Sequence, residues 1–188
     1  MDAPLQDPRL RPQTSLRNRL GRALWQVVYA VLFRTSPRPC HAWRAMLLRC
    51  FGARLGRRCH IYSRCVIWAP WNLRCDDYAC IADEAQIYNV ASVFLGRHSI
   101  VSQQAYICTA THDIDDPDFP MVSAPISIAA YAWVSARACV LPGVDIGEGA
   151  VLGLGAVSSH DLEPWQVYVG MPARRVRARR RHGRATKE

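Results

Sequence analysis

A six-residue period of hydrophobic positions runs along the chain from residue 55 onward. An aliphatic anchor recurs every six residues, and four positions later comes a residue that is small or β-branched in twelve of fourteen cases. The anchors are Leu55, Ile61, Ile67, Leu73, Ile81, Ile87, Leu95, Val101, Ile107, Ile128, Val134, Val140, Ile146 and Leu152. An amphipathic helix repeats near 3.6 residues and an exposed strand near two, so this period predicts short strands joined by tight corners in a solenoid.

Two residues break the repeat, and four glycines indicate where its corners lie. Trp71 and Asp77 occupy small positions, so we expect distorted early coils. Glycines that directly follow an anchor suit corners where a Cβ would be crowded. They are Gly56, Gly96, Gly147 and Gly153.

Residues 1–54 precede the repeat and have helical spacing instead. One stripe comprises Leu16, Leu20, Leu24, Val27, Val28, Val31 and Leu32, and a second comprises Trp43, Met46, Leu47, Cys50 and Phe51 before Gly52. The apolar run 24–33 is about half of the roughly 20 residues that span a bilayer, so no transmembrane helix is predicted. We expect both helices to pack on the domain or on a neighbouring subunit. The alternative is peripheral contact of apolar and arginine-rich faces with an anionic membrane.

The net charge of +9 is unevenly distributed, because the excess of basic residues lies at the two ends of the chain. Residues 1–58 hold twelve basic and two acidic residues, residues 59–173 four and twelve, and residues 174–188 eight and one. Base-stacking aromatics and a reading motif are both lacking, which argues against nucleic-acid binding. We therefore expect one β-helical domain at 55–177, with a loop at 113–127, and a disordered basic tail at 178–188.

Eight cysteines could form a disulfide framework in a small secreted protein, but we expect reduced thiols in a cytoplasmic protein. The amino-terminal sequence opens with Asp, Pro and Arg rather than with a signal peptide. Cys75 and Cys80 lack the spacing of a zinc ribbon. Most of the cysteines are interpreted as small core residues.

Two segments carry a family resemblance: CTATHDIDDPDF at 108–119 and YAWVSARACVLPGVDIGEGAVLGLGAV at 131–157. Together with the repeat they resemble the hexapeptide-repeat acyltransferases over about residues 55–177. The match is to the sugar O-acetyltransferase branch, nearest the colanic acid biosynthesis O-acetyltransferases. The resemblance implies an all-β, left-handed parallel β-helix, a homotrimer and active sites between subunits.

His112 stands where the period stops, between Ile107 and Ile128. A long loop that leaves a regular solenoid is more often functional than accidental. A neutral imidazole can remove a proton from a sugar hydroxyl, and an unperturbed pKa of about 6.5 suits that task. From the residues alone His112 could equally be a hydrogen bonder at the loop entry; the resemblance implies the general base.

Two further residues are candidates for binding the acceptor. Asp113 is the best of the loop acids Asp113, Asp115, Asp116 and Asp118, which could orient the imidazole, bind sugar hydroxyls or only solvate the loop. Asn89 approximately matches a sugar-contacting asparagine of the family, and a corner asparagine is the alternative.

The resemblance also implies acetyl-coenzyme A as donor. Trp133, Ser135 and Ala136 match the wall beside the thioester, where backbone N–H groups could steady an oxyanion. Leu154 stands where relatives often have alanine beside the pantetheine arm. Ser159 and His160, the latter in place of a common lysine, match the closing segment at 158–181. Arg174 and Arg177 match positions that hold the phosphate end.

A zinc enzyme is the rival that the fold itself suggests, because γ-class carbonic anhydrases use three histidines on a β-helix. His60, His98 and His112 are available, but the ligand expected a few residues beyond His112 is missing, and His160 comes next. We therefore predict no metal site.

The sequence thus predicts an acetyl-coenzyme A-dependent O-acetyltransferase in exopolysaccharide or surface-glycan synthesis. Its acceptor would be a sugar or lipid-linked oligosaccharide, at the inner face of the cytoplasmic membrane. Transfer would be direct, because no serine or cysteine lies in a nucleophile motif. The alternatives are acetylation of a xenobiotic or another small molecule, and a catalytically silent scaffold. Serine acetyltransferases carry a larger helical amino-terminal domain than this chain has.

Overall fold

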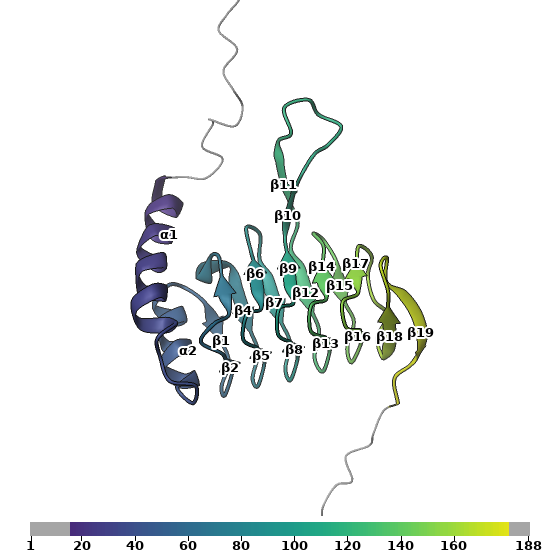
Figure 1. Cartoon of the computed structure of the whole chain (residues 1–188), viewed down its shortest axis with the longest axis horizontal. Coiled ribbons are helices and arrows are strands. Elements are labelled where there is room, and N and C mark those ends of the chain that lie inside the picture. Colours follow the sequence, from purple (N-terminus) through teal and green to yellow (C-terminus); the bar gives the residue numbers. More distant parts are fainter. Residues whose placement is uncertain (1–15, 181–188) are drawn as a thin grey trace, which may run out of the picture.

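The computed structural model describes residues 16–180, which form a coil of short strands capped by helices at one end (Figure 1). Helix α1 (Leu16–Val28) continues into a π-helical turn, η2 (Tyr29–Phe33), and is followed by α2 (His41–Cys50). No helix within these residues is both long and apolar enough to cross a membrane.

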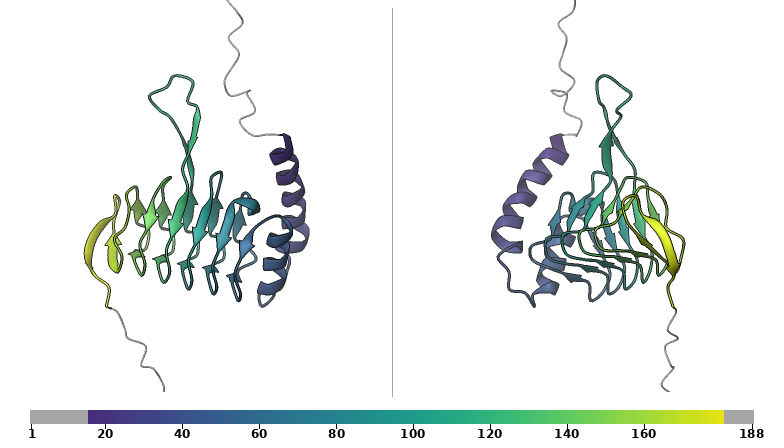
Figure 2. Two further views of the ribbon diagram at one scale, coloured as in Figure 1. Left: turned by 180° about the vertical axis from the view of Figure 1, so that it is seen from behind. Right: turned by 45° about the vertical axis from the view of Figure 1, so that its right-hand side comes forward.

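Three parallel sheets form the three faces of the coil, whose cross-section is triangular (Figure 2). Face A contains β1 (Arg54–Leu55), β4 (Leu73–Cys75), β7 (Val93–Leu95), β12 (Ile126–Ile128) and β15 (Asp145–Ile146). Face B contains β2 (His60–Ile61), β5 (Cys80–Ile81), β8 (Ile100–Val101), β13 (Trp133–Val134), β16 (Val151–Leu152) and β18 (Gln166–Val169), with β19 (Arg174–Ala178) antiparallel to β18. Face C contains β3 (Val66–Ile67), β6 (Gln86–Tyr88), β9 (Tyr106–Cys108), β14 (Cys139–Val140) and β17 (Val157–Ser158).

Each coil runs from face A to face B to face C. We call the corners between a B strand and the next C strand edge BC, and the corners between a C strand and the next A strand edge CA. The 3-10 turn η3 (Pro70–Asn72) lies on edge CA of the first coil.

The predicted repeat builds the core. Every predicted anchor except the half-buried Leu55 is buried, and the parallel register stacks anchors of successive coils, such as Leu95 beside Ile128. Ten of the fourteen small positions are buried as well; the other four are Trp71, Asp77, Ala91 and Thr111. Each fully buried aliphatic side chain stabilises the fold by about 1.5–3 kcal/mol. The expected solenoid is therefore confirmed.

The second coil shows the expected distortion. Leu55 pairs with Cys75, and Cys75 with Leu95, so Cys75 and buried Ala79 take the column positions that the repeat gave to Leu73 and Asp77. Twenty residues separate Leu55 from Cys75, whereas eighteen separate Ile128 from Ile146. The longer corner at η3 shifts the frame by two residues.

The predicted loop 113–127 is largely a β-hairpin. Strand β10 (Ala110–His112) pairs antiparallel with β11 (Met121–Ser123), and His112 lies opposite Met121. The hairpin projects from edge CA between β9 and β12 (Figure 1). Its paired base gives His112 a fixed backbone.

The prediction for the first helix is wrong about which face packs. Trp25 and Phe33 are buried, and Trp25 Nε1 donates to the Ile67 carbonyl at 2.8 Å. Of the expected stripe only Val28 contacts the core, while Leu16, Leu20, Leu24, Val27, Val31 and Leu32 are exposed. The large aromatic rings occupy the space above the first coil, so the aliphatic stripe points away from it.

Helix α2 also departs from its predicted stripe. Leu47 is buried as expected, but Trp43 and Met46 are exposed, and Arg44 and Leu48 are buried in their place. The Arg44 guanidinium donates to carbonyls of the preceding turn and of the first coil, which makes burial of this cation possible.

The basic tail begins later than predicted. Arg179 donates to the carbonyls of Tyr131 at 2.8 Å and Gly149 at 3.0 Å, so it belongs to the folded part. The remainder of the predicted tail, residues 181–188, and the first fifteen residues lie outside the described part of the chain.

Candidate active site

His112 lies at the end of β10 with its ring exposed and held by one contact. Its Nδ1 lies 2.6 Å from the carbonyl oxygen of Phe119, across the hairpin. A carbonyl only accepts hydrogen bonds, so Nδ1 carries a proton in this contact, and in the neutral imidazole it is Nε2 that presents the lone pair. This tautomer and orientation are those that a general base requires.

The hydrogen bonds of the loop acids Asp113 and Asp116 lie within the hairpin and do not orient the His112 imidazole. Asp113 Oδ1 accepts from the Asp115 N–H at 3.1 Å, and Asp116 Oδ1 accepts from the Asp118 N–H at 2.9 Å. The Asp113 N–H donates to the Pro120 carbonyl at 3.0 Å. No hydrogen bond joins Asp113 to the His112 ring anywhere in residues 16–180. Turn formation is the role that their geometry displays.

Asn89 has the contacts of a corner asparagine. Its side chain is fully buried, Oδ1 accepts from the Ala69 N–H at 2.9 Å, and Nδ2 donates to the Ala69 carbonyl at 2.7 Å. These bonds tie together two successive coils on edge CA. The amide therefore has no exposed polar atom to offer to a sugar, and the predicted acceptor contact gains no support.

Four of the predicted cofactor residues gather at edge BC and the adjoining part of face B. Ser135, Ala136 and Leu154 lie at the corner in successive coils, where the Gly155 N–H donates to the Ala136 carbonyl at 3.0 Å. Trp133 lies just before them on β13, partly exposed, and its Nε1 donates to Ser102 Oγ at 2.8 Å. Ser102 was not predicted, although it occupies the same corner one coil earlier.

Two exposed arginines of β19 lie near the carboxy-terminal end of the coil. Among residues 16–180, the guanidinium groups of Arg174 and Arg177 donate only to the neighbouring carbonyls of Ala173 and Ala178. Within residues 16–180 neither forms an ion pair, whereas Arg175 between them pairs with Glu163 at 3.0 Å. Both cations therefore have donors to offer to a phosphate.

The predicted site residues do not meet within one chain. Ser159 and His160 follow β17, so they lie on edge CA with His112, whereas Ser135, Ala136 and Leu154 lie on edge BC. Face C separates the two edges. A site that uses both sets thus needs two copies of the chain, side by side.

Face C itself lacks charge. None of its five strands contains Asp, Glu, Lys or Arg, and burial raises the pKa of Tyr106 and of Cys139, which keeps both neutral near pH 7. Face A, in contrast, carries Arg54, Arg74 and Asp145. An uncharged face suits burial against other subunits.

The three histidines considered as metal ligands are dispersed. The His60 ring stacks on His41, the His98 ring lies between Tyr78 and Tyr131, and His112 is on the hairpin. Over residues 16–180, no three His, Cys, Asp or Glu side chains are grouped so that they could hold a metal ion.

Comparison of structures identifies the class of fold. The acetyl-coenzyme A complex of the hexapeptide-repeat acetyltransferase VCA0836 from Vibrio cholerae superposes with a TM-score of 0.82, covering 90% of this chain and 93% of that one at 21% identity. The coil is accordingly a left-handed parallel β-helix. No family model matches the sequence.

Comparison of sequences identifies the family. The Escherichia coli K12 protein named "Putative colanic acid biosynthesis acetyltransferase WcaF" is 36% identical over 162 residues, which cover 86% of this chain and 89% of that protein. The E. coli protein named "Putative lipopolysaccharide biosynthesis O-acetyl transferase WbbJ" is 26% identical, over 68% of each chain. This chain belongs to the family of WcaF and is an acetyltransferase of polysaccharide biosynthesis.

Proposed function

We propose that this acetyltransferase moves an acetyl group from acetyl-coenzyme A directly to a sugar hydroxyl, with His112 as general base. The observation that carries the proposal is the 2.6 Å contact between His112 Nδ1 and the Phe119 carbonyl, which leaves Nε2 free to accept a proton. Relatives named for colanic acid and lipopolysaccharide biosynthesis support a glycan acceptor.

The reaction uses one proton and no covalent enzyme intermediate. His112 Nε2 takes the hydroxyl proton while the sugar oxygen bonds to the thioester carbonyl carbon. The Ala136 N–H, which has no hydrogen-bond partner among residues 16–180, is a donor for the oxyanion that forms. The C–S bond then breaks, and the leaving thiolate receives the proton from the imidazolium.

The active site lies between subunits of a homotrimer in this proposal. Uncharged face C turns inward, so edge CA of one chain lies against edge BC of the next. His112 of one subunit then faces Ser135, Ala136 and Leu154 of its neighbour, with Ser159 and His160 along the same cleft. The pantetheine arm follows edge BC, and Arg174 and Arg177 hold the phosphates.

Substitution of His112 tests the base. We expect His112→Ala to lower kcat by about 10²–10⁴-fold with acetyl-coenzyme A and a panel of glycans, and to abolish the rise of kcat/KM with pH. The control is Asp115→Asn, an exposed loop acid whose carboxylate has no hydrogen bond in the hairpin as described. Equal turnover by parent and His112→Ala would remove His112 from the mechanism. Transfer only to small xenobiotics would replace the glycan acceptor, and no transfer to any acceptor would favour the scaffold.

Mixing variants tests the shared site. His112→Ala disables edge CA, and Leu154→Arg places a long cation on exposed edge BC. Each variant alone should be inactive. Trimers that contain both variants should regain part of the activity, because in some clefts the intact edge CA of one chain meets the intact edge BC of the other. Absence of recovery, or a monomer by sedimentation, would place the site within one chain.

We also propose that the enzyme works in the cytoplasm, at the inner face of the membrane, through α1. Leu16, Leu20, Leu24 and Val27 are 59–73% exposed and lie within about 80° of the helix circumference, roughly 140° from buried Trp25. No acid occurs between residues 8 and 75, whereas arginines are frequent. An exposed apolar stripe among cations suits anionic lipid, and the like charges disfavour pairing with a second copy.

Vesicle binding tests this contact. The parent should sediment with phosphatidylglycerol vesicles and not with phosphatidylcholine vesicles. Leu20→Ser with Leu24→Ser should weaken binding at least about tenfold, because each buried leucine contributes roughly 1.5–3 kcal/mol. Val176→Ser, on exposed β19, is the matched control. Unchanged binding of the double variant would refute the contact.

A further inference from the structure

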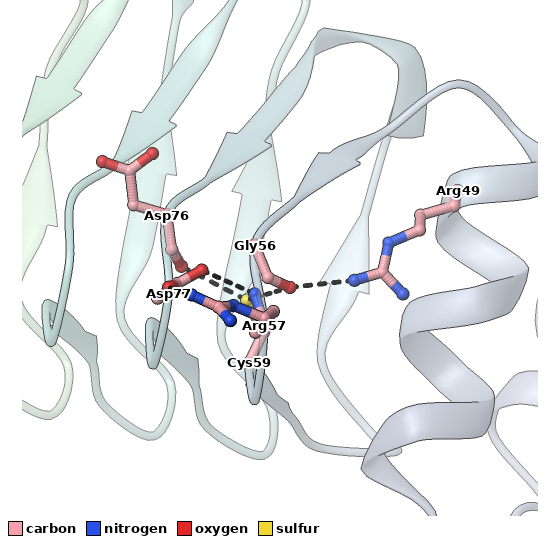
Figure 3. Close-up of polar contacts among 6 residues, drawn as sticks. All are labelled: Arg49, Gly56, Arg57, Cys59, Asp76 and Asp77. Carbon is pink, nitrogen blue, oxygen red and sulfur yellow. Dashed lines mark hydrogen bonds and ion pairs between the residues drawn. The ribbon is translucent and has the colours of Figure 1, made fainter.

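A basic groove of about 730 Å³ lies on face A at the amino-terminal end of the coil, far from β19. Four arginines line it: Arg49, Arg54, Arg74 and Arg97. Figure 3 shows one side of the groove, where Arg49 reaches from α2 to the first coil beside Arg57 and Asp77. Nothing in the proposed acetyl transfer uses these arginines.

The groove places like charges together. Arg54 and Arg74 are partners in the register of β1 and β4, so their Cα atoms are only about 4.8 Å apart. Like charges directly opposite each other on neighbouring strands destabilise a sheet. None of the four lining arginines forms an ion pair within residues 16–180.

The two aspartates of the groove do not neutralise it. Asp77 is engaged by Arg57, through the Arg57 N–H at 2.7 Å and the guanidinium at 3.5 Å. Asp76 is the other lining acid. Four cations against two anions leave an excess of two positive charges along the lining.

Two of the arginines are held in place with donors to spare. Arg49 uses only one terminal nitrogen, NH2, which donates to the carbonyls of Leu55 at 3.1 Å and Gly56 at 2.8 Å. The Arg74 guanidinium lies 5.3 Å from the centroid of the Phe94 ring, a contact that needs no N–H group. Preorganised guanidinium groups lose little entropy when they bind an oxyanion.

From this arrangement we infer that the groove is a binding site for a phosphate-bearing anion of at least two negative charges, of the pyrophosphate class. Planar guanidinium forks match phosphate oxygens, and the bound charge relieves the repulsion between Arg54 and Arg74. The site differs from the proposed cofactor end at Arg174 and Arg177, and it does not depend on acetyl transfer. Its ligand is either a free anion or the pyrophosphate of a lipid-linked molecule.

Calorimetric titration with inorganic pyrophosphate tests the site. The full-length parent is compared with the variant carrying Arg54→Gln and Arg74→Gln, and with Arg64→Gln as a control. Arg64 is an exposed arginine of edge BC that pairs with Glu84 at 3.5 Å, away from the groove. Loss of two charge-assisted contacts should weaken binding by at least about tenfold. The control should bind like the parent.

The cofactor positions are a second place where pyrophosphate could bind, so the number of bound anions is counted. The double variant should lose one pyrophosphate per chain, while the variant with Arg174→Ala and Arg177→Ala should keep the groove's binding. Parent-like affinity and stoichiometry in the double variant would overturn the inference. So would the absence of pyrophosphate binding by the parent.

Thermal unfolding separates this result from misfolding. In phosphate-free buffer the double variant should melt at or above the parent's temperature, since repulsion is removed. Added pyrophosphate should raise the melting temperature of the parent more than that of the variant. A short-chain prenyl pyrophosphate distinguishes the sources: tighter binding than pyrophosphate indicates a lipid-linked ligand, and equal binding a free anion. A parent whose melting temperature pyrophosphate leaves unchanged would contradict the site.

Discussion

Replacing buried Arg44 should destabilise the amino-terminal cap more than any other single change to the helices. Four of the five N–H groups of its guanidinium donate to protein acceptors. Nε donates to Ile61 O at 2.6 Å, NH1 to Ser36 Oγ at 2.8 Å and Pro37 O at 2.9 Å, and NH2 to Arg38 O at 2.6 Å. One side chain thereby joins α2, the turn before it and the first coil.

The expected loss of stability comes from the acceptors that a substitution of Arg44 would leave without a donor. Arg44→Met keeps the volume and removes every donor, so carbonyls at part-buried sites lose their partners at about 1–3 kcal/mol each. These costs overlap, so we expect a total loss of about 3–5 kcal/mol. For a chain of this size we expect a fall in melting temperature of about 6–20 °C. Arg44→Lys, which keeps the charge and reaches fewer acceptors, should lose roughly half as much.

Urea unfolding measures this loss. Both variants are followed by circular dichroism and by tryptophan fluorescence, since Trp25 lies buried beside the first coil. Arg49→Met, an exposed arginine of the same helix, is the control and should change the free energy of unfolding by less than about 1 kcal/mol. A loss below about 1 kcal/mol for Arg44→Met would show that the network adds little to stability.

Three further results are expected. Gly96→Ala should cost about 2–3 kcal/mol in urea unfolding, because its Cβ would lie 2.6 Å from the Ala130 nitrogen. Gly155→Ala has open space and only the strain of its φ of +63°, so a larger loss there than in Gly96→Ala would contradict this. With a maleimide, exposed Cys50 should react first, and Cys80 should react slowly because burial raises its pKa to about 11. Labelling of Cys80 before Cys50 would refute the burial of Cys80. Burial also lowers the pKa of His41, so the free energy of unfolding should fall as the pH drops below about 6.5. The fall should be smaller in His41→Asn. The same pH dependence in parent and variant would show that His41 does not cause it.

The periodic part of the chain could be predicted closely. Anchors such as Ile107 and Ile128 are buried on either side of the interruption, and His112 marks the point where the coil opens. Asn89 shows the limit: a corner asparagine and a sugar-binding asparagine look alike in sequence, and the bonds to Ala69 appear only in the structure. The Phe119 carbonyl that orients His112 carries no sequence signal, because every residue has one.

The helices show where a pattern alone is insufficient. The spacing of Leu20 and Leu24 correctly predicts a helix, yet both face away from the core because Trp25 and Phe33 fill the contact with the first coil. Hydrophobic spacing defines a stripe, but which stripe is buried depends on the shape of the opposing surface. The basic groove is likewise invisible in sequence, since twenty residues separate Arg54 from Arg74.

The sequence by itself therefore determined the solenoid, its period, and the place of its one long excursion. Those features depend on local alternation of apolar and small residues, which repeats with the coil. Tertiary structure alone decided that His112 and the residues of edge BC lie on different edges, that the Asn89 amide is buried against Ala69, and that α1 exposes its aliphatic stripe. These depend on how many residues each corner holds and on which side chains fill the space between distant segments, and neither quantity is periodic in the chain.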